Sequence, residues 1–174
     1  MKLLNRIKNI IIKSELQDIN YLRKMGLQIG RDCEIYNDVS FGSEPYLITI
    51  GNHVRITRGC KLITHDGGIW VIRALTNNPD LDLFGKIKIG NNVHIGMNSI
   101  IMPGVTIGDN CIVGCGAVVT KDIPSSEIWA GIPARKIKTV EEYYTQHKDE
   151  FDNTKKLSYE EKKCYLQRKY NTRY

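Results

Sequence analysis

Residues 89–119 have the sequence IGNNVH IGMNSI IMPGVT IGDNCI VGCGAV V. An aliphatic residue opens every group of six, and a glycine follows it in four of the groups. An α-helix repeats every 3.6 residues and an ordinary strand every two, so neither produces this period. A six-residue repeat predicts a parallel β-helix, in which each hexapeptide forms one side of a triangular coil. The residues expected to point inward are Ile89, Ile95, Ile101, Ile107, Val113 and Val119.

The same phase recurs earlier in the chain, in two runs separated by three extra residues at 43–45. Their inward residues are Ile29, Ile35, Phe41, Ile50, Ile56 and Leu62. A second signal has the same phase, because a small or β-branched residue stands four positions after most inward residues. These residues are Cys33, Val39, Val54, Cys60, Val93, Ser99, Val105, Cys111 and Ala117. We therefore predict an all-β solenoid, with a β-helix domain over 28–138 whose coils occupy about 28–124.

Three appendages interrupt or flank this repeat. Residues 1–27 are expected to form a helical cap, since leucines and isoleucines of 2–25 gather on one helical face; contact with an anionic membrane surface is the alternative. The hexads disappear over 66–86, which we expect to be a long excursion loop. Trp70, Arg73 and Phe84 could there contact a ligand or a neighbouring subunit, or fasten the loop to the coils.

The tail, residues 139–174, carries two helix-start signals. Thr139 with Glu142 and Ser158 with Glu161 have the spacing of capping boxes, so two short helices are expected. The lysines, arginines and tyrosines of 155–174 resemble a nucleic-acid patch, but a solvated or subunit-packing helix is the reading we favour.

The composition narrows the class of protein. The formal charge of +6 suits an anionic cofactor and does not by itself indicate nucleic acid. Cys33, Cys60 and Cys111 occupy the small-residue position and are expected to be packed thiols. Cys115 and Cys164 stand alone, with no disulfide or metal pattern. No signal peptide or membrane-spanning run is evident, so we expect a cytoplasmic protein.

His65 is the strongest candidate for chemistry. It lies where the repeat breaks into the excursion, which would place an imidazole at a rigid strand end beside a cleft wall. Histidine titrates near neutrality and can take a proton from a hydroxyl nucleophile. A polar corner residue without a chemical role is the alternative at this position.

Four motifs give the chain a specific resemblance. It resembles the hexapeptide-repeat acyltransferases over residues 27–138, and within them the maltose and galactoside O-acetyltransferases and the O-acetyltransferases of bacterial capsule and O-antigen clusters. The motifs are IGNNV at 89–93, PGVTIG at 103–108, GCGAVVTKDIP at 114–124 and AGIPAR at 130–135. The resemblance implies a left-handed β-helix, a homotrimer, and acetyl-CoA bound between two subunits, with no metal.

The resemblance also implies roles for individual residues. His65 falls where the family carries its catalytic histidine, which would remove the proton of an acceptor hydroxyl as it attacks the thioester. The positions implied to bind acetyl-CoA are Gly96, Ser99, Gly114, Thr120, Lys121 and Arg135, the basic residues facing the nucleotide phosphates. The acceptor would be a saccharide, a capsule or O-antigen unit or its precursor. The resemblance implies that the acceptor contacts Asp38, Glu44 and His94. We add Asp66 because it is adjacent to His65, and Trp70 because it lies in the excursion loop.

Three alternatives remain open from the sequence. The same scaffold acetylates streptogramin-type antibiotics and serine, so the acceptor need not be a sugar. A zinc site of the carbonic-anhydrase-like branch would need three well-placed histidines, and the gaps between His53, His65 and His94 lack the short paired spacing expected. A purely structural prism would need neither His65 nor the basic residues.

Overall fold

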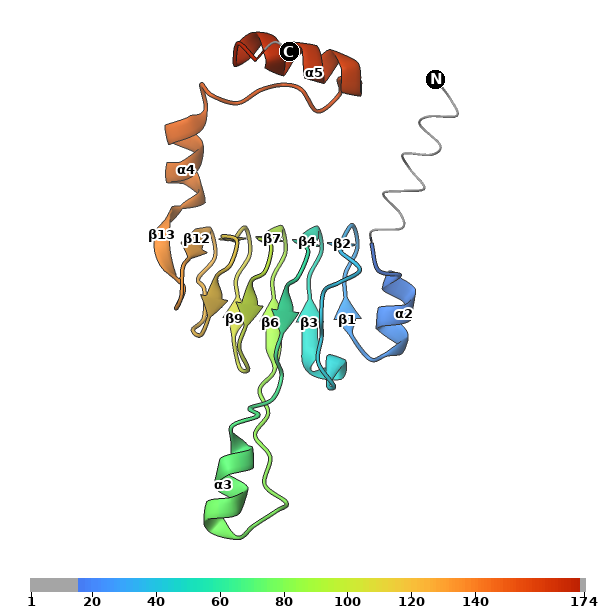
Figure 1. Ribbon diagram of the computed structural model, residues 1–174, viewed down its shortest axis with the longest axis vertical. Helices are drawn as coiled ribbons and strands as arrows, with labels where there is room; N and C mark the ends of the chain where they lie inside the picture. Colours follow the sequence, from blue (N-terminus) through green and yellow to red (C-terminus); the bar gives the residue numbers. More distant parts are fainter. Residues whose placement is uncertain (1–15, 173–174) are drawn as a thin grey trace. The chain divides into compact units, whose positions relative to one another are not determined.

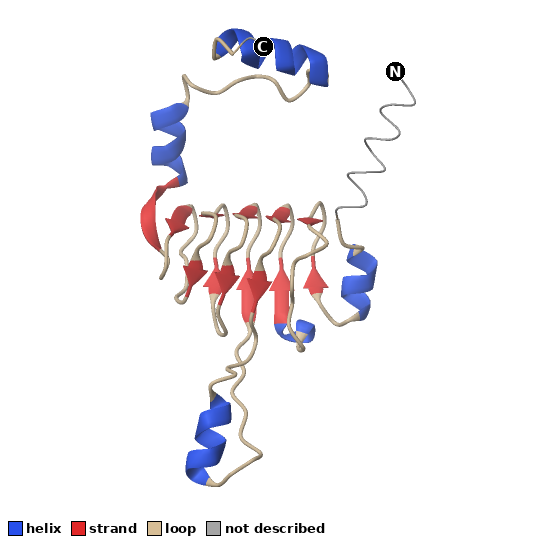
Figure 2. Ribbon diagram, in the orientation of Figure 1, coloured by secondary structure: helices blue, strands red, loops and turns tan. Residues whose placement is uncertain are grey.

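Three parallel sheets form the centre of the computed structural model, which describes residues 16–172. From β3 to β11 successive strands pass to the three sheets in strict rotation, so each circuit of the chain adds one strand to every sheet (Figures 1 and 2). The first sheet contains β1 (Gln28–Ile29), β3 (Ile48–Ile50), β6 (Ile87–Ile89) and β9 (Thr106–Ile107). The second contains β2 (Glu34–Ile35), β4 (Val54–Ile56), β7 (Val93–Ile95), β10 (Ile112–Val113), β12 (Glu127–Ala130) and the antiparallel β13 (Arg135–Thr139). The third contains β5 (Lys61–Leu62), β8 (Ile100–Ile101) and β11 (Val118–Val119).

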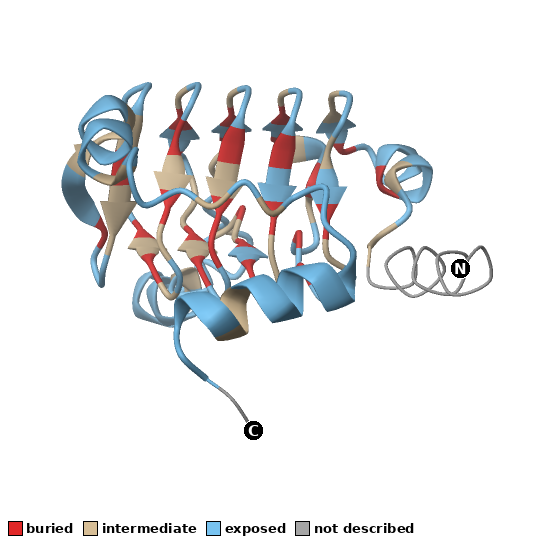
Figure 3. Cartoon of the chain, turned by 90° about the horizontal axis from the view of Figure 1, so that it is seen from above, coloured by how far each residue is buried: buried red, intermediate tan, exposed pale blue. Residues whose placement is uncertain are grey.

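The predicted inward residues are the core. Equivalent residues are directly in register, as in the stack of Leu62, Ile101 and Val119 in the third sheet. Of the twelve inward residues all except the half-buried Ile29 are buried, and buried segments recur on successive strands (Figure 3). Burying each aliphatic side chain contributes about 1.5–3 kcal/mol. The six-residue repeat therefore predicted both the strands and the side of each strand that faces the core.

The small-residue positions also face inward, most of them at the first residue of a strand or directly before it. Eight of the nine are buried, and Cys33 is half-buried. Ser99 Oγ donates to the carbonyl oxygen of Gly96 at 2.7 Å, and Cys60 Sγ lies 3.1 Å from that oxygen. Burial raises the pKa of the Cys60 and Cys111 thiols, which keeps them neutral. The prediction of packed thiols is confirmed for these two cysteines.

One corner of the coils is built from residues with left-handed backbone. Five residues with positive φ recur there, one per circuit: Asp32, His53, Asn92, Asn110 and Ser126. The residues directly before the last four form a ladder of hydrogen bonds between successive coils. In it Asn52 N donates to Asn91 Oδ1 at 2.9 Å, and Asn91 N donates to Asp109 Oδ1 at 2.6 Å. Asparagine and aspartate tolerate this conformation and bond locally, which explains the IGNNV and IGDNC motifs.

Within the described residues, only part of the predicted N-terminal helix is helical. Residues 1–15 lie outside the described residues. Leu16 forms an antiparallel bridge with Tyr36, so the expected helix over 2–25 is wrong for 16–18, and α2 (Ile19–Lys24) begins after the N-cap Asp18. Leu22 of this helix and Leu27 after it are buried in the same hydrophobic cluster as the coils. This packing agrees with a capping role for α2.

The excursion is not a plain loop, since it contains the helix α3 (Ile69–Thr76), which lies apart from the sheets at the end of two connecting segments (Figure 1). A short 3-10 helix, η1 (Pro45–Leu47), occupies the other interruption of the repeat. No side chain of α3 is buried, and Trp70 and Leu75 are 73% and 77% exposed.

The tail forms the two predicted helices, α4 (Val140–His147) and α5 (Tyr159–Lys169). Both capping boxes are present: Thr139 and Glu142 exchange bonds of 2.6 and 3.0 Å, and Ser158 and Glu161 bonds of 2.7 and 3.2 Å. The chain divides into two compact units, 1–142 and 143–174, so the division falls within α4. Within the described part of the chain, no helix has the length and apolar character needed to cross a bilayer.

Candidate active site

His65 lies at the base of the excursion, three residues after the end of β5. It pairs with Phe84 of the returning segment in an antiparallel bridge. On either side of this bridge Gly85 N donates to Thr64 O at 2.8 Å and Asp66 N donates to Leu83 O at 2.9 Å. The two ends of the excursion are thus joined at His65, and the backbone of the histidine is fixed both by the coil and by the returning segment.

Glu44 orients the imidazole. Its Oε2 accepts a hydrogen bond from Thr64 Oγ1 at 2.7 Å and lies 3.0 Å from His65 Nδ1. Hydrogen bonds from Thr64, Ser43 and His65 lower the pKa of Glu44 to about 2, so the carboxylate is ionised. An ionised carboxylate only accepts hydrogen bonds, so Nδ1 carries the proton of the neutral imidazole and Nε2 has the free lone pair. This is the form of histidine that can act as a base.

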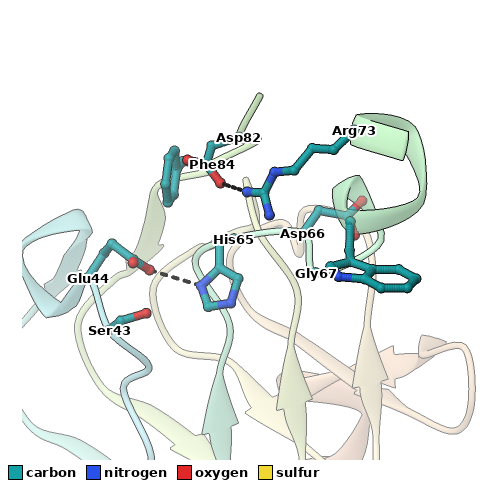
Figure 4. A pocket seen from close by; sticks show the side chains of 9 residues that line it. Ser43, Glu44, His65, Asp66, Gly67, Arg73, Asp82 and Phe84 are labelled. Carbon is teal, nitrogen blue, oxygen red and sulfur yellow. Dashed lines mark hydrogen bonds and ion pairs between the residues drawn. The ribbon is translucent and has the colours of Figure 1, made fainter. Parts of the chain in front are cut away.

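A pocket of about 390 Å³ opens over this pair (Figure 4). Glu44 points to His65 from one side, and Arg73 and Asp82 lie across the pocket from Glu44. The Phe84 ring meets the imidazole edge to face, with centroids 6.5 Å apart and an interplanar angle of 71°. The lining residues are Ser43, Glu44, His65, Asp66, Gly67, Trp70, Arg73, Asp82 and Phe84. The volume is that of a small-ligand site with His65 on its floor.

Three of the five residues predicted to contact the acceptor line this pocket, namely Glu44, Asp66 and Trp70. Asp66 Oδ1 accepts from Gly68 N at 2.8 Å, so this carboxylate also organises the turn before α3. Asp38 and His94 do not line it. His94 lies in β7 of the second sheet, in register with Arg55 and Ile112, where burial and Arg55 lower its pKa. The structure of the chain therefore does not bring these two residues to His65.

The role of Glu44 toward His65 was missed, although the repeat contained the signal. Ser40 and Lys61 form a parallel bridge, which sets an offset of 21 residues between these coils. The same offset places Glu44 beside His65. It equals the 18 residues of a circuit of three hexapeptides plus the three extra residues at 43–45. Counting this offset of 21 residues along the sequence would have predicted that Glu44 and His65 are neighbours. The pocket positions of Ser43, Gly67 and Asp82 had no signal of this kind.

The residues implied to bind acetyl-CoA fall into two groups. Thr120 and Lys121 follow β11 and are exposed, and Arg135 opens β13. Ala134 N donates to Val118 O at 2.8 Å, which brings the segment of Arg135 beside that of Lys121. The register of β5, β8 and β11 places Val119 two strands from Leu62, about 10 Å at ~4.8 Å per strand. The basic segment and the segment of His65 therefore both follow carboxyl ends of strands in the third sheet.

Gly96, Ser99 and Gly114 lie between adjacent coils. The Ser99 hydroxyl is used internally, since it donates to the carbonyl oxygens of Gly96 and Gly114. A Cβ on Gly96 would lie 2.5 Å from Cys115 N, so glycine here allows the close approach of the next coil. Any contact of these three residues with a ligand would therefore involve backbone atoms. Within the described residues, no three His, Cys, Asp or Glu side chains are grouped so that they could hold a metal ion.

The ionised state of Glu44 predicts a loss of stability in acid. Its pKa is lowered from 4.5 to about 2 in the folded chain, so its stabilising effect is complete above pH 4.5 and is lost as the pH falls toward 2. We expect the difference in thermal midpoint between wild type and Glu44→Gln to be full at pH 7, smaller at pH 3 and lost only near pH 2, as measured by circular dichroism. An equal difference at all three pH values would contradict this account.

Comparison with known proteins agrees with the repeat. Residues 86–121 match the family model described as bacterial transferase hexapeptide (six repeats). Protein CapG of Staphylococcus aureus is 56% identical over 151 residues, which cover 86% of this chain and 87% of that protein. The crystal structure of a maltose O-acetyltransferase from Clostridium difficile 630 is 32% identical, with a TM-score of 0.53 and coverage of 69% of this chain and 73% of that one.

A second solved structure, described as galactoside acetyltransferase in complex with coenzyme A, is 28% identical, with a TM-score of 0.56 and coverage of 72% and 71% of the two chains. The six-residue repeat, the strand register and the relatives agree on the class of protein. The chain therefore belongs to the hexapeptide-repeat acyltransferases and is an acyltransferase.

Proposed function

We propose that this chain is an O-acetyltransferase that moves the acetyl group of acetyl-CoA to a hydroxyl of a saccharide. The observation that carries the proposal is the Glu44–His65 pair, which leaves Nε2 of the imidazole as an acceptor in a pocket large enough for a sugar unit. The names of the maltose and galactoside enzymes support a sugar as the acceptor, and the coenzyme A complex supports the donor. A capsule or O-antigen unit, or its precursor, is the acceptor class that we propose.

His65 acts as the general base in this scheme. Its Nε2 takes the proton of the acceptor hydroxyl while the oxygen attacks the carbonyl carbon of the thioester. The imidazole becomes a cation, which the ionised Glu44 carboxylate at Nδ1 stabilises. Cleavage of the carbon–sulfur bond then releases the CoA thiolate, which takes up the proton held by His65. The scheme needs no covalent enzyme intermediate.

The coils are proposed to form a left-handed β-helix, the fold implied by this family, and three chains a homotrimer. Exposed apolar residues of α3 support a subunit contact, because Trp70, Val71, Ile72 and Leu75 are between 41% and 77% exposed. Acetyl-CoA would lie between subunits, along the edge of the third sheet that joins His65 to Lys121. Thr120, Lys121 and Arg135 would contact its phosphates, and Gly96, Ser99 and Gly114 the pantetheine arm through backbone atoms.

We expect acetyl-CoA binding to depend on the basic segment. The double variant Lys121→Ala/Arg135→Ala removes two positive charges that the proposal places at the phosphates, so the Kd should rise about tenfold or more. Isothermal titration calorimetry with wild type and variant measures this change. Lys88→Ala is a matched control, since Lys88 is exposed in the middle of β6 in the first sheet. Wild type that does not bind acetyl-CoA would exclude the proposed donor.

A further inference from the structure

One wall of the pocket carries a pair of opposite charges that the proposed reaction does not use. Arg73 comes from α3, and its Nε donates to Leu81 O at 2.7 Å while its Nη2 donates to Asp82 Oδ1. Figure 4 shows the guanidinium across the pocket from Glu44, with one amino group turned to Asp82 and the other directed toward His65. Arginine has five N–H donors, of which these contacts use two. The Asp82 side chain is 56% exposed.

The pair therefore presents hydrogen-bond donors and acceptors side by side. Such an arrangement fits two neighbouring hydroxyls, because each sugar hydroxyl both donates and accepts. Trp70 and Phe84 line the same pocket and supply apolar surface for the C–H face of a sugar ring. Arg73 alone would suit an anionic group, but Asp82 already compensates its charge.

The net charge of the residues that line the pocket favours an uncharged acceptor over an acidic one. Three carboxylates, those of Glu44, Asp66 and Asp82, face one guanidinium, a formal charge of −2 with His65 neutral. Glu44 is held ionised by its hydrogen bonds, so it contributes its charge throughout the physiological range. A carboxylate on the acceptor would be repelled in a pocket with this balance.

We propose that Arg73 and Asp82 are specificity-determining residues, which bind neighbouring hydroxyls of an uncharged sugar and make the pocket discriminate against acidic sugars. The inference rests on the proposed function, because it concerns the acceptor of that reaction. The proposal assigns the discrimination between acceptor sugars to the excursion, the part of the chain outside the repeat.

Matched pairs of acceptors test the inference. Methyl galactoside and methyl galacturonide, and methyl glucoside and methyl glucuronide, differ only in a CH₂OH or carboxylate group. We expect wild-type kcat/KM to be about tenfold higher for the uncharged member of a pair. Asp82→Asn should lower activity toward the uncharged sugar and narrow this ratio, since Arg73 is then uncompensated. Arg73→Gln should widen the ratio. Asp80→Asn, the same change on an exposed residue outside the pocket lining, should leave it unaltered.

Asp82→Asn and Arg73→Gln are expected to change the ratio of kcat/KM values in opposite directions. This distinguishes a role of the pair in sugar recognition from a purely structural role. If the pair only holds the excursion together, both variants will lower activity toward both acceptors by the same factor, which overturns the inference. A wild-type preference for the acidic sugar also overturns it. Saturation-transfer NMR of the same sugars separates this inference from the proposed function. Selective binding of the uncharged sugar without acetyl transfer would refute the reaction and retain the selectivity, whereas binding of neither sugar would refute the inference.

Discussion

His65→Ala is expected to lower kcat for acetyl transfer by about 10²- to 10⁴-fold, the range over which a positioned base contributes. The substitution removes the Nε2 acceptor, and no other imidazole lines the pocket. Acetyl-CoA affinity should stay near the wild-type value, because the proposed phosphate contacts lie two strands away along the third sheet. The expected signature is therefore a loss of turnover with donor binding retained.

A coupled assay of CoA release and calorimetry of acetyl-CoA together measure the two quantities. His147→Ala provides a matched control, since His147 pairs with Glu150 in the second compact unit and has no proposed role in the reaction. The control should retain wild-type turnover. A His65→Ala protein that keeps half of its activity would remove His65 from the mechanism.

The coils could be predicted from the sequence because their geometry repeats. Every circuit places an aliphatic residue at the same point, so one rule accounts for Ile95 and Val113 alike, and both are fully buried. The rule fails at the ends of the coils. Leu16 pairs with Tyr36, although a helix was predicted over 2–25, because the open end of the coils can hydrogen-bond to a passing segment. The six-residue pattern does not indicate this pairing.

The pocket was only partly predictable for a related reason. His65 was identified by its place at the break in the repeat, and Glu44 follows from counting the phase across the extra residues at 43–45. Arg73 and Asp82 are paired by the fold of the excursion, which has no repeat and is set by tertiary contacts such as Asp66 N to Leu83 O. Side-chain pairs of this kind appear only once the backbone is known.

The substitution Glu44→Gln is expected to lower kcat by about 10- to 100-fold, by analogy with the loss of the carboxylate that orients a metal-bound histidine. The amide keeps the size of the side chain but has no negative charge to stabilise the imidazolium. Its NH₂ group can also donate toward Nδ1, which favours the wrong tautomer. Both effects act on the chemical step, so kcat should fall more than the KM for acetyl-CoA rises.

Thr64→Val is the matched control for this substitution. It removes one donor to Glu44 Oε2 and leaves the contact of that oxygen with His65 in place. Because the carboxylate then keeps its charge and its bond to Nδ1, we expect a smaller loss of kcat than for Glu44→Gln. Equal losses in the two variants would show that the pocket floor has been disturbed as a whole. A larger loss for Glu44→Gln in a protein with wild-type acetyl-CoA affinity would locate the effect in the proton transfer at His65.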